Sequence, residues 1–333
     1  MNILLTGGTG YIGSHTALVL AQAGHRITLF DNLCNSQISV ASRLETLSAQ
    51  KMDFVQGDVR DTPLLSSVLK ERNIDAVIHF PGLKAVGDSV KNPVEYYANN
   101  VQGSISLLQA MQANHIKTLV FSSSATVYGV PHYLPYDETH PTKAINPYGS
   151  TKLQIEDMLR DVAASDPEWS IAVLRYFNPV GAHESGFIGE MPSGVPNNLM
   201  PYLVQVASGK REELRIFGND YDTKDGTGER DYIHVMDLAD GHLAALKYLL
   251  TNTGWHPINL GTGQSTSVLE LVRTFESVTT KVIPCKIAER RDGDLPMYYA
   301  QSSKANQLLG WSAKRDLAEM CESAWRWEEI GSL

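Results

Sequence analysis

The sequence has 333 residues, of which 43% are hydrophobic and 20% charged, and its formal net charge is −9. This length is enough for one large domain or two closely associated ones. The acidic balance and the lack of a long basic cluster argue against nucleic-acid binding, and no apolar run approaches the length of a membrane span.

The three cysteines, Cys34, Cys285 and Cys321, are scattered along the chain. They form no C-x-x-C pair, and no histidine and cysteine cluster has the spacing of a zinc site, so we expect no metal. The first residues already read as a strand of the fold and leave no room for a signal peptide. We therefore expect a soluble, cytoplasmic protein without membrane or nucleic-acid partners.

The first 31 residues predict a strand, a glycine-rich turn, a helix and a second strand. Residues 2–6 form an apolar run, and Gly8, Gly10 and Gly13 fit the pattern G-x-G-x-x-G. Apolar residues with helical spacing follow over 11–23, and 27–30 read as a strand that ends at Asp31. This order of elements is the context that a dinucleotide-binding turn requires.

Each part of this segment has a physical role in holding a dinucleotide. Glycines permit the tight turn and the close approach of a pyrophosphate, which the free N–H groups of the helix N-terminus then bind. Asp31 lies where an acidic residue accepts hydrogen bonds from the adenosine ribose. Because that carboxylate would repel a 2′-phosphate, the segment predicts NAD as the cofactor and not NADP.

Strands and helices alternate along the next 150 residues. Further strands are predicted at 53–57, 75–80, 117–122 and 170–175, and helices at 38–47, 62–72, 93–114 and 148–165. This alternation predicts an α/β fold of the Rossmann type, a doubly wound parallel sheet with helices on both faces. Ligands of such sheets bind beyond the carboxyl ends of the strands, so the residues that follow each strand are candidate site residues.

The composition and the pattern of the sequence change after Asn178. Glycine, proline and asparagine dominate from Pro179 to Asn198, and no clear alternation of strands and helices continues. We expect residues 1–177 to bind NAD and residues 178–333 to form a smaller C-terminal region that mainly binds substrate. The segment at about 234–262, which reads as a helix and a strand, is expected to return to the first domain.

A pair of residues on the helix at 148–165 carries the predicted chemistry. Tyr148 and Lys152 are four residues apart and so share one face of that helix. A nearby ammonium group and the positive nicotinamide both favour the phenolate, which moves Tyr148 toward use as a general base. Ser124, at the end of the preceding strand, can hydrogen-bond to the same substrate oxygen.

The glycine turn, together with Ser124, Tyr148 and Lys152, resembles the extended short-chain dehydrogenase/reductase family. Longer stretches resemble the nucleotide-sugar epimerases of that family: residues 6–15, 31–36, 122–129, 174–183, 196–201, 228–241 and 293–296. The resemblance implies an isomerase of galactose metabolism that interconverts UDP-galactose and UDP-glucose at C4. Its expected route is transient oxidation to a 4-keto sugar by tightly bound NAD, with Tyr148 as the base.

The same resemblance implies two sets of binding residues. The cofactor set is Gly7, Gly10, Tyr11, Ile12, Gly13, Asp31, Asn32, Leu33, Cys34, Asn35, Ser36, Asp58, Val59, Phe80, Pro81, Gly82, Leu83, Lys84, Asn99, Ser124, Tyr148, Lys152 and Phe177. The UDP-sugar set is Lys84, Ser124, Tyr148, Asn178, Asn198, Leu199, Ile216, Phe217, Arg230, Arg291, Asp294 and Tyr298. Arginines suit a diphosphate because a guanidinium can form two parallel hydrogen bonds to it.

Two positions bear on how this chain compares with the family. Pro81 stands where the family usually has alanine, and proline removes one backbone N–H beside the cofactor. Tyr298 stands where members that accept N-acetylated sugars tend to have a small residue, so poor use of UDP-N-acetylglucosamine is expected. The neighbouring Tyr299 leaves open which of the two rings faces the pocket.

Other functions are compatible with parts of this pattern. A nucleotide-sugar dehydratase shares the fold and the first oxidation, but its relatives tend to carry Asp-Glu where this chain has Ala125 and Thr126. A simple dehydrogenase would exchange its cofactor at each turnover, and a non-catalytic sugar-nucleotide sensor would not need Tyr148. The resemblance also implies a homodimer, formed through the helix at 93–114 and the one that starts near Tyr148.

Overall fold

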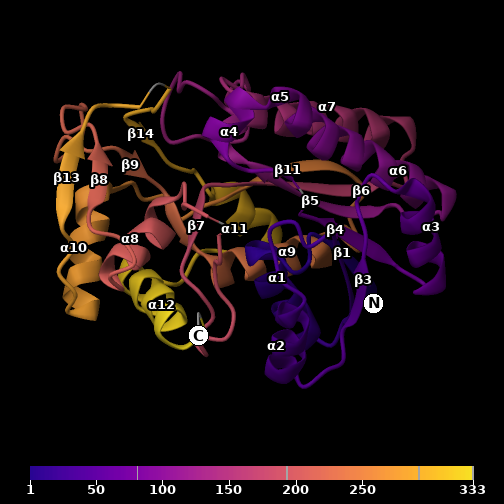
Figure 1. Ribbon diagram of the computed structural model, residues 1–333. Helices are drawn as coiled ribbons and strands as arrows, with labels where there is room; N and C mark the ends of the chain where they lie inside the picture. The colour runs from indigo at the N-terminus through magenta and orange to yellow at the C-terminus, as the bar shows by residue number, and fades with distance from the viewer. Residues whose placement is uncertain (81, 193, 292, 332–333) are drawn as a thin grey trace.

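A parallel sheet of seven strands forms the centre of the molecule (Figure 1). The computed structural model describes residues 1–80, 82–192, 194–291 and 293–331. The sheet has the order β11-β6-β5-β4-β1-β2-β3. Its strands are β1 (Asn2–Thr6), β2 (Arg26–Asp31), β3 (Asp53–Gln56), β4 (Ala76–His79), β5 (Thr118–Ser124), β6 (Ser170–Tyr176) and β11 (Gly254–Leu260). The strand order reverses direction beside β1, which is where such sheets bind their ligands.

Helices cover both faces of this sheet (Figure 1). One layer comprises α1 (Tyr11–Gln22), α2 (Ser39–Ser48) and α9 (Val235–Leu249). The other comprises α3 (Thr62–Glu71), α4 (Val86–Lys91), α5 (Pro93–Tyr96), α6 (Gln102–Ala113) and α7 (Pro147–Ser165). This architecture confirms the predicted Rossmann-type fold.

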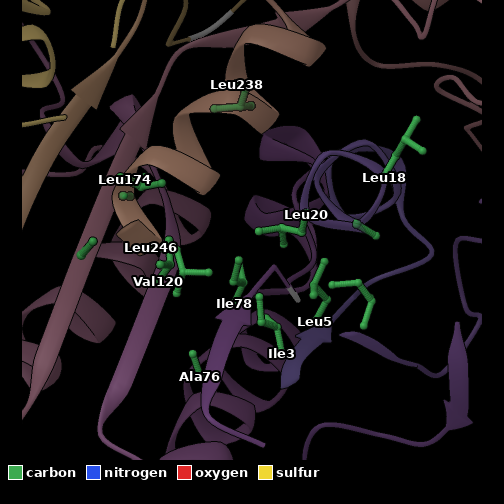
Figure 2. Close-up of a cluster of buried hydrophobic side chains, with 14 of the residues drawn as sticks. Ile3, Leu5, Leu18, Leu20, Ala76, Ile78, Val120, Leu174, Leu238 and Leu246 are labelled. Atoms are coloured by element: carbon green, nitrogen blue, oxygen red, sulfur yellow. The ribbon is translucent and has the colours of Figure 1, made fainter. Parts of the chain in front are cut away.

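The side chains of the central strands are buried on both faces. Ile3 and Leu5 of β1 pack with Leu20 of α1 in the cluster that Figure 2 shows. Leu4, which points to the opposite face, joins the cluster of α3, α6 and α7. Burial of alternate residues on opposite faces explains why these strands are continuous apolar runs in the sequence.

The predicted helix at 93–114 has an irregular centre. It consists of α5, a π-helical segment η1 (Tyr97–Val101) and α6. π-Helical turns inside α-helices are frequent at functional sites. Here the segment carries Asn99, one of the predicted cofactor residues, and the buried Asn100.

The remaining elements form a second region beside the sheet (Figure 1). It contains three short sheets, β10-β7, β12-β9-β14 and β13-β8, and the helices α8, α10 and α12, whereas α11 packs against α9 and β11 of the main sheet. The strands are β7 (Asn178–Val180), β8 (Leu214–Phe217), β9 (Glu229–Arg230), β10 (Tyr232–His234), β12 (Thr266–Ser267), β13 (Cys285–Ala288) and β14 (Met297–Tyr298). The helices are α8 (Leu199–Ala207), α10 (Val268–Thr279), α11 (Ser303–Leu309) and α12 (Leu317–Ile330), and η2 (Ala125–Val127) is a 3₁₀ turn after β5.

This second region has a hydrophobic core of its own. Leu203 of α8, Phe275 of α10 and Met320 of α12 are buried together. Its first strand, β7, begins two residues after β6 ends, so the region starts at the carboxyl edge of the main sheet. Among the residues that the structure describes, no helix is long and apolar enough to cross a membrane.

Candidate active site

The glycine-rich turn connects β1 to α1. Gly7 has a φ of 71°, in the left-handed region. A Cβ on Gly13 would lie 2.3 Å from the carbonyl oxygen of Gly7, so a side chain cannot be accommodated there. The N-terminus of α1 has no side-chain cap and no acidic residue in its first turn. Its backbone N–H groups are therefore available to an anion, and the turn fits the pyrophosphate of NAD.

Asp31 lies at the carboxyl end of β2, and its side chain is almost completely buried. The carboxylate accepts hydrogen bonds from the Thr9 backbone N–H at 3.2 Å, the Leu33 N–H at 2.9 Å and the Ser36 hydroxyl at 3.1 Å. It thus links the glycine turn to the loop at 32–36. Two carboxylate oxygens offer about four acceptor positions, so about one position remains for a ribose hydroxyl.

Asp58 and Val59 follow β3 on the same edge of the sheet. The Asp58 carboxylate forms an ion pair with Arg60, at 2.6 Å between Oδ2 and Nη2. The hydrogen bond from Arg60 lowers the pKa of Asp58. Cys34, in the loop after β2, is an exposed free thiol, and partial burial with the nearby Asp31 raises its pKa. This thiol is therefore protonated at neutral pH and is not a nucleophile.

The loop after β4 is held by Asn100 of the π-helical segment. The Asn100 amide accepts a hydrogen bond from the Leu83 N–H at 2.9 Å and donates to the Leu83 carbonyl at 3.2 Å. It also donates to Thr151 of α7 at 3.0 Å. The cofactor loop is thereby connected to the helix that carries Tyr148. Pro81, whose effect on the cofactor was in question, lies outside the described residues.

Tyr148 and Lys152 lie on the first two turns of α7. The side chain of Asn146 caps the helix by accepting a hydrogen bond from the Gly149 N–H at 2.8 Å, and Pro147 occupies the first helical position, as its fixed φ favours. Both predicted site residues are buried. The Lys152 ammonium donates to the Ser122 carbonyl at 2.8 Å and lies 5.9 Å from the centre of the Tyr148 ring.

Burial shifts the pKa of both residues away from their charged forms. It raises the pKa of Tyr148 to about 12, although the hydrogen bond with Ser124 acts in the opposite direction. It also lowers the pKa of Lys152 to about 8. The sequence led us to expect a lowered Tyr148 pKa; in the protein alone the cost of desolvating the phenolate is larger than the effect of the neighbouring groups. A further positive charge is needed to make Tyr148 a base at neutral pH.

Tyr298 is the tyrosine whose ring faces the site. Its hydroxyl donates to Asn178 at 3.2 Å, and the Arg230 guanidinium lies 4.6 Å from its ring centre. It is also close enough to Tyr148 to raise the pKa of that residue. For Tyr299, the contact shown is through the main chain, where its carbonyl accepts from the Tyr136 N–H. The Tyr298 ring therefore lies beside Asn178 and Arg230, two of the predicted substrate residues.

Arg230 does not pair with the acidic residues on either side of it, because both have other partners. The Glu229 carboxylate is buried and accepts hydrogen bonds from Lys224 and Ser265. Asp231 is also buried, and its carboxylate binds main-chain N–H groups of the segment 262–263 and of Ala300. Within the described part of the chain no ion pair involves Arg230. Its Nη1 donates to the carbonyls of Glu229 at 2.9 Å and Pro296 at 3.4 Å, which leaves the other N–H groups of the guanidinium for a phosphate.

Two other predicted substrate residues, Asp294 and Phe217, contact Arg291. The Arg291 guanidinium forms an ion pair with Asp294, at 2.8 Å between Nε and Oδ2, and lies 4.7 Å from the ring centre of Phe217. Ile216 is adjacent to Phe217 on β8, but its side chain is buried. Only its main chain can therefore contact a ligand. Leu199 begins α8 beside Asn198.

Glu190 is a site residue that the sequence did not reveal. Its carboxylate forms an ion pair with Lys84 at 2.9 Å and accepts a hydrogen bond from the Asn198 amide at 3.4 Å. It is separated from Lys84 by 106 residues, and nothing local in the sequence indicates this contact. Glu156 was also missed, although its position four residues after Lys152 places it on the same face of α7.

Comparison with known proteins identifies relatives over nearly the whole chain. A family model described as GDP-mannose 4,6 dehydratase matches residues 4–324. The chain is 54% identical to the UDP-glucose 4-epimerase of Bacillus subtilis over 328 residues, which is 98% of this chain and 97% of that protein.

Solved structures of UDP-glucose 4-epimerases are also similar to this chain over nearly its whole length. One is the UDP-glucose 4-epimerase of Stenotrophomonas maltophila, which was solved with NAD and formylated UDP-arabinopyranose. It has a TM-score of 0.97 and 50% identity, and the match covers 99% of this chain and 98% of that one. That of Bifidobacterium longum, solved with NAD⁺ and UDP, has a TM-score of 0.96 at 47% identity, over 99% of this chain and 98% of that one. The chain therefore belongs to the UDP-glucose 4-epimerase family of extended short-chain dehydrogenases/reductases.

Proposed function

We propose that this protein interconverts UDP-galactose and UDP-glucose at C4, using bound NAD and Tyr148 as the base. The geometry that carries this proposal is the convergence of Ser124, Tyr148 and Lys152 at the carboxyl edge of the sheet, beside the glycine turn. Membership of the epimerase family and the relatives solved with NAD support the reaction and the cofactor. The role of each residue follows from its position.

Tyr148 accepts the proton of the sugar 4-hydroxyl and later returns it. NAD supplies the hydride acceptor, which takes the hydride from C4 and gives it back to the opposite face of the 4-keto sugar. The Ser124 hydroxyl hydrogen-bonds to the Tyr148 oxygen and stabilises its ionised form. Burial opposes ionisation of Tyr148. In this proposal the positive charge of the bound cofactor lowers the Tyr148 pKa and allows the residue to act as a base.

Lys152 and the glycine turn hold the cofactor in this proposal. The Lys152 ammonium, fixed on the Ser122 carbonyl, donates to the nicotinamide ribose, while Asp31 accepts from the adenosine ribose. We propose that residues 1–177 bind NAD and residues 178–333 mainly the UDP-sugar, with about 234–262 returning to the first domain. In the second region, Arg230 and Arg291 bind the diphosphate, and Asn178 with Tyr298 contacts the sugar.

The main alternative is a nucleotide-sugar dehydratase, which is the description that the matching family model carries. Such an enzyme must eliminate water from the 4-keto sugar and needs an acid and a base after β5. This chain has Ala125 and Thr126 there, and the Thr126 hydroxyl donates to Ser124 at 3.0 Å. Neither side chain can exchange protons with carbon at neutral pH. Release of a 4-keto-6-deoxy sugar nucleotide would nevertheless identify a dehydratase.

Two other functions predict different products. A dehydrogenase would accumulate NADH from a UDP-sugar, and a non-catalytic sensor would form no product and would bind equally well without the Tyr148 hydroxyl. Tyr148 is buried with its hydroxyl hydrogen-bonded to Ser124 and with Lys152 beside it, and this combination of a tyrosine, a serine and a lysine favours catalysis over sensing.

We also propose that the protein is a homodimer located in the cytoplasm. Val90 of α4 is 62% exposed and Val94 of α5 is 80% exposed, on the helical layer that includes α7. Apolar side chains exposed together on one face are typical of an interface. All three cysteines are free thiols, which is usual in reducing compartments.

An isotope experiment tests the proposed route. UDP-galactose that carries deuterium at C4 is incubated with the protein in ordinary water, and the product is examined by NMR. Return of the same hydride predicts UDP-glucose with deuterium retained at C4. Loss of deuterium to solvent would contradict the proposal, since it would require proton abstraction from carbon.

A further inference from the structure

A buried acidic residue on the catalytic helix has no part in the mechanism above. Tyr148, Lys152 and Glu156 follow one another at intervals of four residues on α7 and therefore share one face. Glu156 is only 1% exposed. A carboxylate is almost never buried to this extent unless it is paired, because removing its charge from water is costly.

Glu156 is paired with Arg175 of β6. The Arg175 Nη2 lies 2.6 Å from Oε2, and its Nε lies 3.1 Å from both carboxylate oxygens. Arg175 is itself 4% exposed, and its Nη1 donates to the Tyr128 hydroxyl at 3.1 Å. Buried ion pairs of this kind contribute little net stability relative to apolar side chains of similar volume. Stability alone therefore does not explain this ion pair.

The second partner of Glu156 lies between two residues of the active site. The Ser123 hydroxyl of β5 donates to Glu156 Oε1. On one side of Ser123, the Ser122 carbonyl accepts the hydrogen bond of the Lys152 ammonium, at 2.8 Å. On the other side is Ser124, which interacts with Tyr148. The carboxylate thus fixes the end of β5 against α7 at the point where these groups meet.

We propose that Glu156, held by Arg175, is a positioning residue that keeps Lys152 charged and aligned with Ser124. Its negative charge favours the ammonium form of Lys152, in opposition to burial. Its hydrogen bond to Ser123 holds the strand that carries the acceptor of Lys152. This inference rests on the proposed function, since it assigns a role to a residue next to the proposed catalytic group.

The titratable groups that surround Lys152 on the neighbouring strands keep one protonation state between pH 7 and 10. His79 of β4 is buried, and its burial and the charge of Lys152 hold its pKa well below the usual value. Burial raises the pKa of Tyr176 of β6 far above this range, and Arg175 stays protonated because Glu156 raises its pKa. Ionisation of Tyr148 on the same helix forms the base and so raises the activity. Loss of the Lys152 proton therefore accounts for the alkaline limb of the pH profile.

The test replaces the carboxylate by a neutral amide of the same shape. Glu156→Gln is purified with its cofactor, and the rate of conversion of UDP-galactose is measured from pH 6 to 10. We expect kcat to fall about tenfold or more and the alkaline limb to move to lower pH by about one unit, with KM little changed. We also expect the protein to lose NAD more readily during dialysis at pH 9, measured as cofactor released on denaturation.

Asp157→Asn is the matched control. It removes the same charge from the next residue of the helix, but the Asp157 side chain is 50% exposed and pairs with Arg160. Its pH profile and NAD content should equal those of the unmodified protein. If Glu156→Gln retained the unmodified kcat, pH profile and NAD content, the inference would be wrong.

A double variant tests the inference if the single variant does not fold. If Glu156→Gln alone leaves Arg175 unpaired and does not fold, Glu156→Gln with Arg175→Met removes both buried charges and is expected to fold. Its alkaline limb should move in the same direction but by less, because a positive charge is lost together with the carboxylate. An undisplaced limb in that variant would overturn the inference. Failure of the proposed function would look different, since the unmodified protein would then form no UDP-glucose at all.

Discussion

Replacement of Tyr148 by phenylalanine removes one oxygen and keeps the buried ring. With a pKa of about 12 in the protein alone, ionising this tyrosine at pH 7 costs about 7 kcal/mol. The proposed mechanism has the bound cofactor and Lys152 offset most of that cost. Loss of a general base typically slows a reaction by about 10²–10⁴-fold, so we expect kcat of Tyr148→Phe to fall by this factor.

The assay follows formation of UDP-glucose from UDP-galactose by chromatography, with protein concentration and NAD content determined for each sample. Tyr133→Phe serves as the control, because Tyr133 is 44% exposed and its hydroxyl donates to Asp137, away from the site. The control should retain full activity. Both variants should bind NAD as the unmodified protein does. A kcat for Tyr148→Phe within about threefold of the unmodified value would refute the assignment of the base.

Three further predictions follow from particular contacts. Tyr298→Ala should increase the ratio of kcat/KM for UDP-N-acetylglucosamine to that for UDP-glucose, since it removes a ring beside Asn178; an unchanged ratio in parallel assays would contradict this. Burial lowers the pKa of His15 and His234 to about 3 and of His242 to about 4. Because the unfolded chain takes up these protons below pH 6.5, each histidine should cost about 2 kcal/mol of stability at pH 5, and the melting temperature should be clearly lower at pH 5 than at pH 7. Val94→Glu should weaken the proposed dimer in light scattering, whereas a protein that is already monomeric before the change would exclude that interface.

The sequence predicted the parts of the site that depend on local pattern. The glycine turn, Asp31 and the pair of Tyr148 and Lys152 are each defined by residues within one or two elements. Their convergence follows from the parallel sheet, because the carboxyl ends of parallel strands lie on one edge. The fold class was predictable for the same reason, since the alternation of strands and helices is a property of the chain itself.

Other features could not be predicted because they depend on distant contacts or on burial. Glu190 meets Lys84 only through the folding of the second region against the first. Asn100 reaches the loop after β4 because of a π-helical turn that no simple sequence pattern signals. The raised pKa of Tyr148 follows from desolvation, which only the packed structure reveals.

The central claim is that NAD remains bound and is regenerated in every catalytic cycle. The most direct measurement incubates the purified protein with UDP-galactose, without added NAD, and detects UDP-glucose. We predict that UDP-glucose forms to equilibrium, that no NADH accumulates, and that denaturation releases NAD from the protein. Absence of UDP-glucose both without and with added NAD, from a protein that is folded by circular dichroism, would contradict the proposed function.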